Sequence, residues 1–116
     1  MPLPKPVIYY YTTPAGSNPI KEFINSFKPQ QQVKILRIFQ YIQEYGLTIH
    51  LPQIKKLTGT PLWEIRILGK QSLRLLYVIP RKNLVLILHG FIKKTAKTPK
   101  KELKTALNRY QEWLDR

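Results

Sequence analysis

Residues 62–89 read LWEIRILGKQSLRLLYVIPRKNLVLILH and contain the pattern from which the architecture of this chain follows. Three runs rich in β-branched, aromatic and aliphatic residues are separated here by short polar turns, which predicts strands at 62–68, 72–79 and 84–89. The last run begins with LVLIL and is apolar at each of these positions. We therefore expect an inner strand that is covered on both faces.

The first two strands are predicted to form a hairpin closed by Gly69-Lys70-Gln71, with Leu68 opposite Ser72. Because side chains alternate along a strand, this register gathers a wholly apolar face, which must be the core side. That face consists of Trp63, Ile65, Ile67, Leu73, Leu75 and Tyr77. The alternation of side chains thus fixes the register of the hairpin, apart from a shift by two residues.

The same register places Arg66 opposite Arg74 on the outward face, with Glu64 one pair along. Like charges in directly opposed positions destabilise a sheet by up to about 1 kcal/mol. An anionic ligand between the two guanidinium groups would turn this repulsion into a clamp, because their forked donors fit phosphate oxygens. The alternative is that Glu64 pairs diagonally with an arginine and relieves the repulsion.

The N-terminal half predicts one strand and two helices. Residues 7–11 are β-branched and aromatic and predict a strand. Asn18 is expected to cap a helix that starts at Pro19, and Pro29 to start a longer helix that ends at Gly46. The expected buried stripe of the longer helix consists of Val33, Ile35, Leu36, Ile38, Phe39 and Ile42. Residues 47–60 are predicted to be a connector.

A last helix is expected after the three strands, with Thr98 as its N-cap and Pro99 in its first turn. Its predicted apolar face consists of Leu103, Ala106, Leu107, Tyr110 and Leu114. The element order is then β-α-α-β-β-β-α. It predicts an α+β fold in which a small, mainly antiparallel sheet packs against helices, and residues 1–116 are interpreted as one domain.

Positive charge is concentrated in one part of the chain. Residues 51–100 hold 11 Lys and Arg against a single acid, whereas the net charge of all 116 residues is +14. Such a region attracts a polyanion, most commonly nucleic acid, and the alternative is a generically cationic surface. Lys93, Lys94 and Lys97 lie just before the last helix, where helix donors help to hold phosphate, unless these lysines are simply solvated.

Several classes of protein are disfavoured by composition. Cysteine is absent, so we expect no disulfide framework, thiolate metal site or cysteine nucleophile. His50 and His89 are too few for a metal cluster, and His89 is interpreted as a hydrogen-bonded structural residue. No cofactor is expected. The prolines near the N-terminus and the lack of a stretch of about 18 apolar residues argue against a signal peptide or a membrane span, which predicts a cytoplasmic protein.

Four motifs carry a resemblance to a known family. They are KLTG at 56–59, LWEIR at 62–66, LRLLY at 73–77, and LHGFIKKT at 88–95 followed by Thr98-Pro99. Together with the predicted element order, they resemble the RelE/ParE toxin superfamily along the whole chain. The likeness is greatest to its phage-derived, HigB-like branch.

The resemblance implies the toxin of a type II toxin–antitoxin pair. Such a toxin is a ribosome-dependent, metal-independent endoribonuclease, an mRNA interferase that cleaves mRNA in the ribosomal A site and inhibits translation. The implied catalytic residues are Arg66, Arg74, Lys94 and Glu64. Arg74 and Lys94 would grip the scissile phosphate, and Arg66 would assist or orient the attacking ribose. The implied contacts to flanking mRNA or ribosomal RNA are Lys55, Lys56, Lys93 and Lys97.

Two positions depart from the family pattern. Glu64 stands where RelE has a lysine that can serve as general base, and Lys100 or a close neighbour stands where RelE has a tyrosine. The general base therefore stays open between Glu64 and Lys94, and the general acid is unassigned.

The alternative functions are a ParE-like inhibitor of DNA gyrase, a non-catalytic nucleic-acid-binding module and an inactive relic of a toxin. The ParE branch lacks the basic catalytic residues present here. Single-strand binders expose stacking aromatic residues, whereas Trp63 and Tyr77 are predicted on the core face. Besides the ribosome and mRNA, the implied partner is a cognate antitoxin with a helix-turn-helix domain, similar to HigA. It would mask the basic face or displace the last helix.

Overall fold

The computed structural model describes residues 5–46, 51–67, 69 and 72–116. Within them the elements are β1 (Val7–Tyr10), α1 (Pro19–Asn25), α2 (Pro29–Tyr45), β2 (Ile54–Lys56), β3 (Trp63–Ile67), β4 (Leu73–Arg81), β5 (Leu84–Ile92) and α3 (Lys100–Leu114). The strands form one sheet in the order β1-β5-β4-β3-β2, in which β1 is parallel to β5 and the other neighbours are antiparallel. The predicted α+β class, with its mainly antiparallel sheet, is confirmed.

The predicted element order was wrong by one strand, because β2 lies inside the expected connector. It pairs with β3 at the edge of the sheet and places Lys55 opposite Glu64. The observed order is β-α-α-β-β-β-β-α. A strand of three residues is too short for an alternating pattern, so its pairing with β3 defines it rather than its own propensity. Residues 47–50, which include His50, lie outside the described residues.

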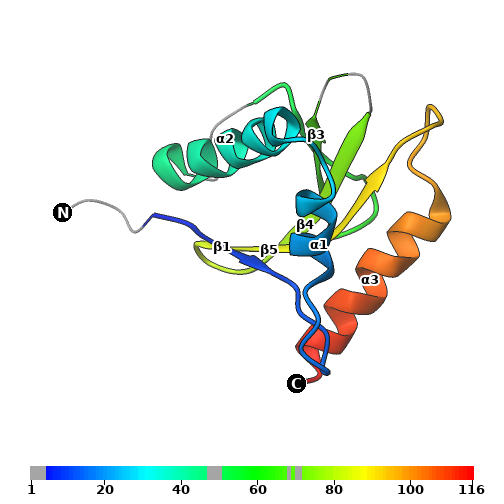
Figure 1. Cartoon of the computed structure of the whole chain (residues 1–116). Helices are drawn as coiled ribbons and strands as arrows, with labels where there is room; N and C mark the ends of the chain where they lie inside the picture. Colours follow the sequence, from blue (N-terminus) through cyan, green and yellow to red (C-terminus); the bar gives the residue numbers. More distant parts are fainter. Residues whose placement is uncertain (1–4, 47–50, 68, 70–71) are drawn as a thin grey trace.

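Helices cover both faces of the sheet, with α1 and α2 on one face and α3 on the other (Figure 1). On the first face, a Cβ added to Gly90 of β5 would lie only 2.8 Å from the ring of Phe23 in α1. On the second face, the neighbouring residue His89 contacts Glu102 and Arg109 of α3. Since successive residues of a strand point to opposite faces, β5 is an inner strand covered on both sides, as its sequence predicts.

The predicted register of the β3–β4 hairpin is confirmed over the described residues. The observed pairs are Trp63–Tyr77, Glu64–Leu76, Ile65–Leu75, Arg66–Arg74 and Ile67–Leu73. The rings of Trp63 and Tyr77 stack with their centroids 6.2 Å apart on the core face, as expected. The predicted pairing of Leu68 with Ser72 and the loop residues 70–71 lie outside the described residues.

The helix boundaries in the N-terminal half follow their predicted signals. The side chain of Asn18 accepts a hydrogen bond from the Lys21 backbone at 3.0 Å and caps α1. The longer helix, α2, ends at Gly46, whose φ of 87° favours glycine. Its buried residues are Ile35, Phe39 and Ile42. The prediction was wrong for Val33 and Leu36, which are each 43% exposed, because α2 buries a narrower stripe than its apolar residues suggest.

The last helix also departs from the prediction at both ends. It begins at Lys100 with Pro99 as the cap residue, and no side chain caps it. Thr98 was wrongly predicted as the N-cap, because its hydroxyl donates instead to Glu64 of β3. Leu114 is 49% exposed and does not belong to the buried face, in which Ala106 is fully buried.

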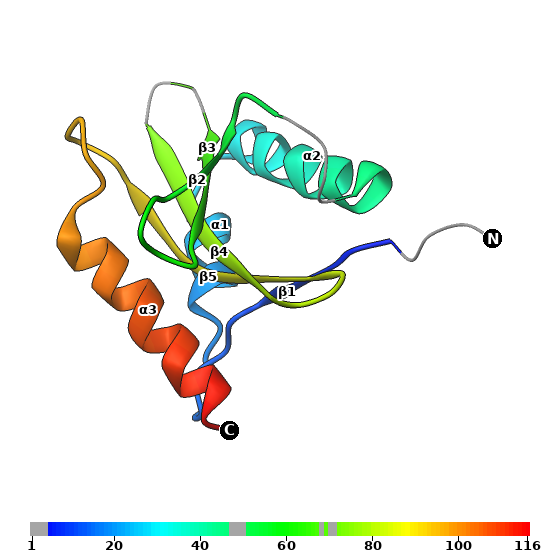
Figure 2. The same cartoon turned by 180° about the vertical axis from the view of Figure 1, so that it is seen from behind.

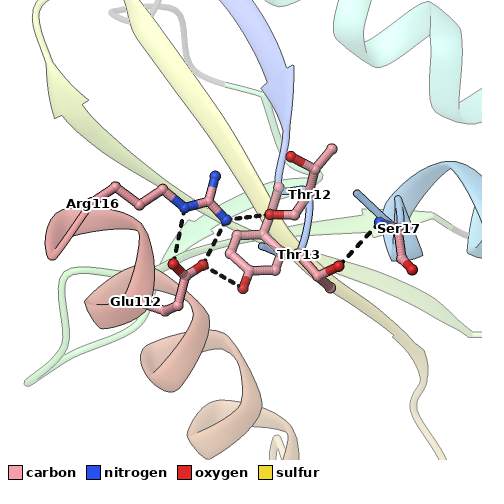
Figure 3. A network of polar contacts seen from close by, with 6 residues as sticks. Thr12, Thr13, Ser17, Glu112 and Arg116 are labelled. Atoms are coloured by element: carbon pink, nitrogen blue, oxygen red, sulfur yellow. Dashed lines mark hydrogen bonds and ion pairs between the residues drawn. The ribbon is translucent and has the colours of Figure 1, made fainter. Parts of the chain in front are cut away.

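Polar contacts at its C-terminal end hold α3 to the residues that follow β1. At the C-terminal end, the Tyr11 hydroxyl donates to Glu112 at 2.7 Å, and Arg116 forms an ion pair with Glu112 and donates to the Thr12 carbonyl (Figure 3). At the N-terminal end, residues 93–99 form the loop that leads from β5 into α3 (Figure 2).

None of the helices in the described residues has an apolar stretch of membrane-spanning length.

Candidate active site

The two predicted arginines lie opposite each other on neighbouring strands, but Arg74 is buried and Arg66 is only partly exposed. Arg66 on β3 pairs in register with Arg74 on β4. The prediction of a solvent-facing position was wrong for these two residues of that face, because Arg74 is only 6% exposed and Glu64 only 2%. The α3 helix and the loop before it cover this part of the sheet, and a strand pattern gives no sign of a distant helix that packs on its polar face.

Glu64 and Arg74 form a buried ion pair across β3 and β4. The Nε of Arg74 lies 3.3 Å from Oε1 of Glu64, although its hydrogen is not aligned for a hydrogen bond. The alternative in which Glu64 pairs diagonally with an arginine is therefore confirmed. The second carboxylate oxygen, Oε2, accepts a hydrogen bond from the Thr98 hydroxyl at 2.8 Å. Both oxygens of the only acid in residues 51–100 are thus occupied.

The guanidinium of Arg74 is oriented by the start of its own strand. Its Nη1 donates to the Ser72 hydroxyl at 2.8 Å and to the Leu73 carbonyl at 3.0 Å. Burial lowers the pKa of Arg74, the neighbouring charge of Glu64 raises it, and that of Arg66 lowers it again. An arginine stays charged through such changes, so the site presents a fixed, buried positive charge at every physiological pH.

The predicted lysines lie around this pair on two separate segments. Lys55 and Lys56 are exposed on β2, with Lys55 directly opposite Glu64. The other segment is the loop before α3, where Lys94 and Lys97 are exposed and Lys93 is half-buried. The Lys93 backbone N–H donates to the Ser72 carbonyl at 2.7 Å, which fixes the start of this loop beside the residues that hold Arg74.

His89 is a structural residue, as the sequence predicts. Its Nε2 lies 3.2 Å from Glu102, and Nη1 of Arg109 lies 3.3 Å from its Nδ1 and 2.9 Å from the Leu88 carbonyl. Because Arg109 can only donate, Nδ1 accepts and the proton sits on Nε2 in a neutral ring. Burial lowers the pKa of His89, which favours the same neutral form. His89 therefore joins β5 to α3.

Sequence reasoning missed the residues that hold the predicted ones in place. Ser72 and Thr98 each contact one member of the buried pair. The sequence predicts backbone roles for both, at a strand start and a helix start, whereas their side-chain partners depend on tertiary contacts. The described residues contain no group of three or more His, Cys, Asp and Glu side chains that could hold a metal ion.

The fold and the site together define a small α+β protein in which an arginine–carboxylate pair is buried beneath a lysine-rich loop. Residues 22–111 match the model of the family described as phage-derived protein Gp49-like (DUF891). The match covers most of the chain, so the chain belongs to this family. The matched region contains all of the predicted site residues. No curated protein matches the chain.

Proposed function

We propose that this protein is the toxin of a type II toxin–antitoxin pair and acts as a ribosome-dependent mRNA endoribonuclease. The observation that carries the proposal is the fixed, buried charge of Arg74. It lies opposite Arg66 and beside a loop with three lysines. Cations from two neighbouring strands and an adjacent loop are the residue types that stabilise a phosphate which gains charge in a transition state. Membership of the phage-derived Gp49-like family supports the same reading.

The proposed reaction is attack by a ribose 2′-hydroxyl on the adjacent phosphate. The 2′ oxygen forms a bond to phosphorus and loses its proton to a base, while the bond from phosphorus to the 5′ oxygen breaks and that oxygen gains a proton. Arg74 and Lys94 neutralise the phosphate oxygens, and Arg66 assists. Glu64 contacts both Arg74 and Thr98, which favours it as the residue that positions Arg74 and leaves Lys94 as the candidate for proton transfer.

RNA can reach Arg74 only if the covering loop moves, because the side chain is 6% exposed. The loop is attached to this site by the hydrogen bond from Thr98 to Glu64 and by the backbone contact from Lys93 to Ser72. A hydrogen bond to a charged group contributes about 1.5–3 kcal/mol, which ribosome and mRNA contacts can replace. We therefore propose that the loop opens when the protein engages its substrate.

The test is a cell-free translation reaction with purified protein, in which mRNA 5′ ends are mapped with and without ribosomes. We expect cuts only with ribosomes, and a loss of about 100-fold in cleavage rate for Lys94→Ala. Lys82→Ala removes one exposed lysine from the turn between β4 and β5 and is the matched control, for which we expect the wild-type rate. Arg74→Lys retains the charge but not the forked donors, and it should lose most activity.

The outcomes separate this function from its alternatives. Ribosome-dependent cuts that persist in both Lys94→Ala and Arg74→Lys would leave the activity and refute the site. Gyrase-dependent DNA damage without mRNA cleavage would replace the proposal with the ParE-like one. If Glu64→Gln abolishes cleavage while Arg74 keeps its position, Glu64 is the base rather than a positioning residue.

The proposed partner is an antitoxin with a helix-turn-helix domain and an acidic segment. The excess of cations in residues 51–100 favours an acidic partner, because complementary charge accelerates association and suppresses wrong partners. Co-expression of such a partner should restore growth that the protein alone inhibits, and the complex should weaken as salt is raised.

A further inference from the structure

A cavity of about 320 Å³ lies where the C-terminal end of α3 meets β1 and the turn between β4 and β5. Its lining contains no acidic residue and includes Tyr9, Arg81, Leu84, Leu86, Trp113 and Arg116. These residues come from both ends of the chain and from its middle, so the tertiary fold brings them together. The candidate active site uses none of them.

The cavity lies on the same face of the sheet as Arg74. Tyr11, two residues after Tyr9 in the extended chain, donates to Glu112 of α3, so alternation places Tyr9 on the α3 face as well. The cavity residue Arg81 and Arg74 lie near opposite ends of β4, about 20 Å apart along the strand. The cavity is therefore a separate site on the face that contains the candidate active site.

The cavity contains a cation that has no carboxylate partner. The guanidinium of Arg81 lies over the ring of Trp113, 5.9 Å from its centroid, so this side chain also faces α3. Arg81 makes no ion pair or hydrogen bond with the part of the chain that the structure describes. Contact with the indole restrains the guanidinium, whereas its forked N–H donors stay available to an anionic group.

The second guanidinium of the cavity is already paired. Arg116 forms an ion pair with Glu112 and also donates to the Thr12 carbonyl (Figure 3). Among the described residues that line the cavity, Arg81 is thus the cation without a carboxylate partner. One such cation fits a single phosphate group better than a run of phosphates.

Aromatic surface beside this cation is open to a ligand. The side chain of Tyr9 is 59% exposed, and its ring stacks on no other aromatic ring of the described residues. Proteins that bind single strands expose such rings as stacking platforms, whereas Trp63 and Tyr77 of the hairpin lie on the core face. Tyr9 supplies on the α3 face the platform that the hairpin lacks.

These features together select the class of ligand. An exposed ring next to an unpaired guanidinium fits an unpaired nucleotide, because its base can stack and its phosphate can accept from the forked donors. A volume of about 320 Å³ is at the lower end of the range for small-ligand sites, which is enough for one nucleotide but not for a duplex. Inorganic phosphate would use Arg81 and leave Tyr9 without a role.

We propose that this cavity binds one unpaired nucleotide of RNA, with the base stacked on Tyr9 and the phosphate held by Arg81. The inference deepens the proposed function and rests on it for the identity of the nucleic acid as RNA. Because the cavity lies about 20 Å from Arg74, the nucleotide belongs either to a flanking part of the mRNA or to ribosomal RNA.

The experiment measures binding of a short, fluorescently labelled single-stranded oligoribonucleotide by anisotropy, without ribosomes, over a range of salt concentrations. For Tyr9→Leu we expect affinity to fall about 10-fold with an unchanged salt dependence, and Tyr9→Phe should bind as the wild type does. For Arg81→Gln we expect a fall of about 5-fold, and the slope of log K against log salt should decrease by about 0.7, the value for one phosphate contact on a single strand.

The chain offers a matched control for each change. Tyr45 of α2 is 60% exposed, so Tyr45→Leu removes a similarly exposed ring outside the cavity. Lys82→Gln removes an exposed charge next to Arg81, from a residue that does not line the cavity. We expect each control to change affinity by less than about 2-fold. If the controls matched the cavity variants, the proposal would be overturned, because binding would depend only on general exposure and net charge.

The source of the nucleotide follows from cross-linking in ribosome complexes with 4-thiouridine placed in the mRNA alone. A cross-link that Tyr9→Leu removes would assign the nucleotide to mRNA. No cross-link, together with weaker binding of Tyr9→Leu to ribosomes, would assign it to ribosomal RNA, and both results support the site. A labelled peptide of alternating glutamate and phenylalanine provides the opposing outcome. If its binding depended on Tyr9 and Arg81 while RNA binding did not, the cavity would be a protein-docking surface and the proposal would be wrong.

This measurement and the cleavage assay fail independently. Tyr9-dependent RNA binding without any ribosome-dependent cleavage would refute the proposed function and keep the nucleotide site. Cleavage that depends on Lys94, with wild-type RNA binding by both Tyr9→Leu and Arg81→Gln, would refute the nucleotide site alone.

Discussion

The two faces of the β3–β4 hairpin differ in what they bury. The face toward α1 and α2 buries only apolar and aromatic side chains, with Ile65 and Leu75 no more than 1% exposed. The face toward α3 buries Glu64 and Arg74 beside Leu76, although the two faces belong to the same ten paired residues. The hairpin thus has an apolar face and a charged face, and helices cover both.

The difference shows which face the fold requires. Burial of apolar surface drives folding without further conditions, whereas a buried ion pair often contributes no more stability than well-packed apolar side chains of similar volume. A sequence selected only for folding would place leucine or methionine at positions 64 and 74. The presence of the pair on the α3 face, where stability does not require it, is the physical reason to connect that face with function.

Removal of one member of the buried ion pair should have the largest effect on stability. Glu64→Ala leaves the charge of Arg74 buried without its carboxylate, and we expect the free energy of unfolding to fall by about 3–5 kcal/mol. Leu75→Ala removes buried volume from the apolar face and leaves a cavity. It should lower the free energy of unfolding by a similar amount, about 2–5 kcal/mol. Urea unfolding followed by far-UV circular dichroism measures both changes.

The double variant Glu64→Leu with Arg74→Met separates the two faces. On the charged face, apolar replacement of both partners should restore stability to within about 1 kcal/mol of the wild type and leave the protein folded but unable to cleave mRNA. On the apolar face, by contrast, replacement of an apolar residue by a charged one should destabilise the protein. A double variant as unstable as Glu64→Ala would show that the pair is needed for folding and would remove the argument for function.

The same contrast explains how much of the fold could be predicted from the sequence. The hairpin register followed from alternation, because a slip by one residue would expose the apolar face. β2 could not be predicted, because its three residues are defined by pairing with β3. The burial of Val33 and Leu36 was overestimated, since a helix pattern indicates which residues are apolar but not how much of the helix surface packs against the rest of the protein.

The candidate site was predictable only in part. Opposition of Arg66 and Arg74 follows from the register, whereas burial of Arg74 depends on a helix that begins 26 residues later. The hydrogen bond from Thr98 to Glu64 joins residues 34 positions apart, so no local pattern contains it. The cavity at the C-terminal end of α3 joins residues from both ends of the chain, and its aromatic residues resemble ordinary core residues in the sequence.

The apolar face is also sensitive to small additions of volume. A Cβ at position 90 would lie 2.8 Å from the Phe23 ring and 3.0 Å from a methyl carbon of Leu75. Gly90→Ala should gain about 0.5–1 kcal/mol in chain entropy but lose about 1–3 kcal/mol through overpacking, so we expect net destabilisation of about 1 kcal/mol by urea unfolding.

A double-mutant cycle with Phe23→Leu identifies the clash as the cause. The smaller side chain makes room for the added methyl group, so the double variant should be more stable than the sum of the two single changes. Additive losses would mean that the strand backbone at Gly90, rather than contact with α1, accounts for the effect.

The smallest expected effect concerns His89, which lies on the charged face. Burial lowers its pKa below the ordinary value of 6.5, the charge of Arg109 adds to this, and Glu102 opposes it. The unfolded chain therefore binds a proton at a higher pH than the folded one. The contribution of His89 to stability is fully present above pH 6.5 and is lost as pH falls through the folded pKa.

We therefore expect the wild type to lose stability between pH 7 and pH 5 more steeply than His89→Gln, in which the group that titrates is absent. The measurement is urea unfolding of both proteins at several pH values in constant salt, and the difference between their two slopes isolates His89 from the carboxylates. Stability that rises in the wild type as pH falls would mean that the attraction of Glu102 for a charged imidazole outweighs burial. In that case an ion pair between His89 and Glu102 would hold α3 to the sheet, and the charged face would carry one more positive charge than it does with a neutral His89 ring.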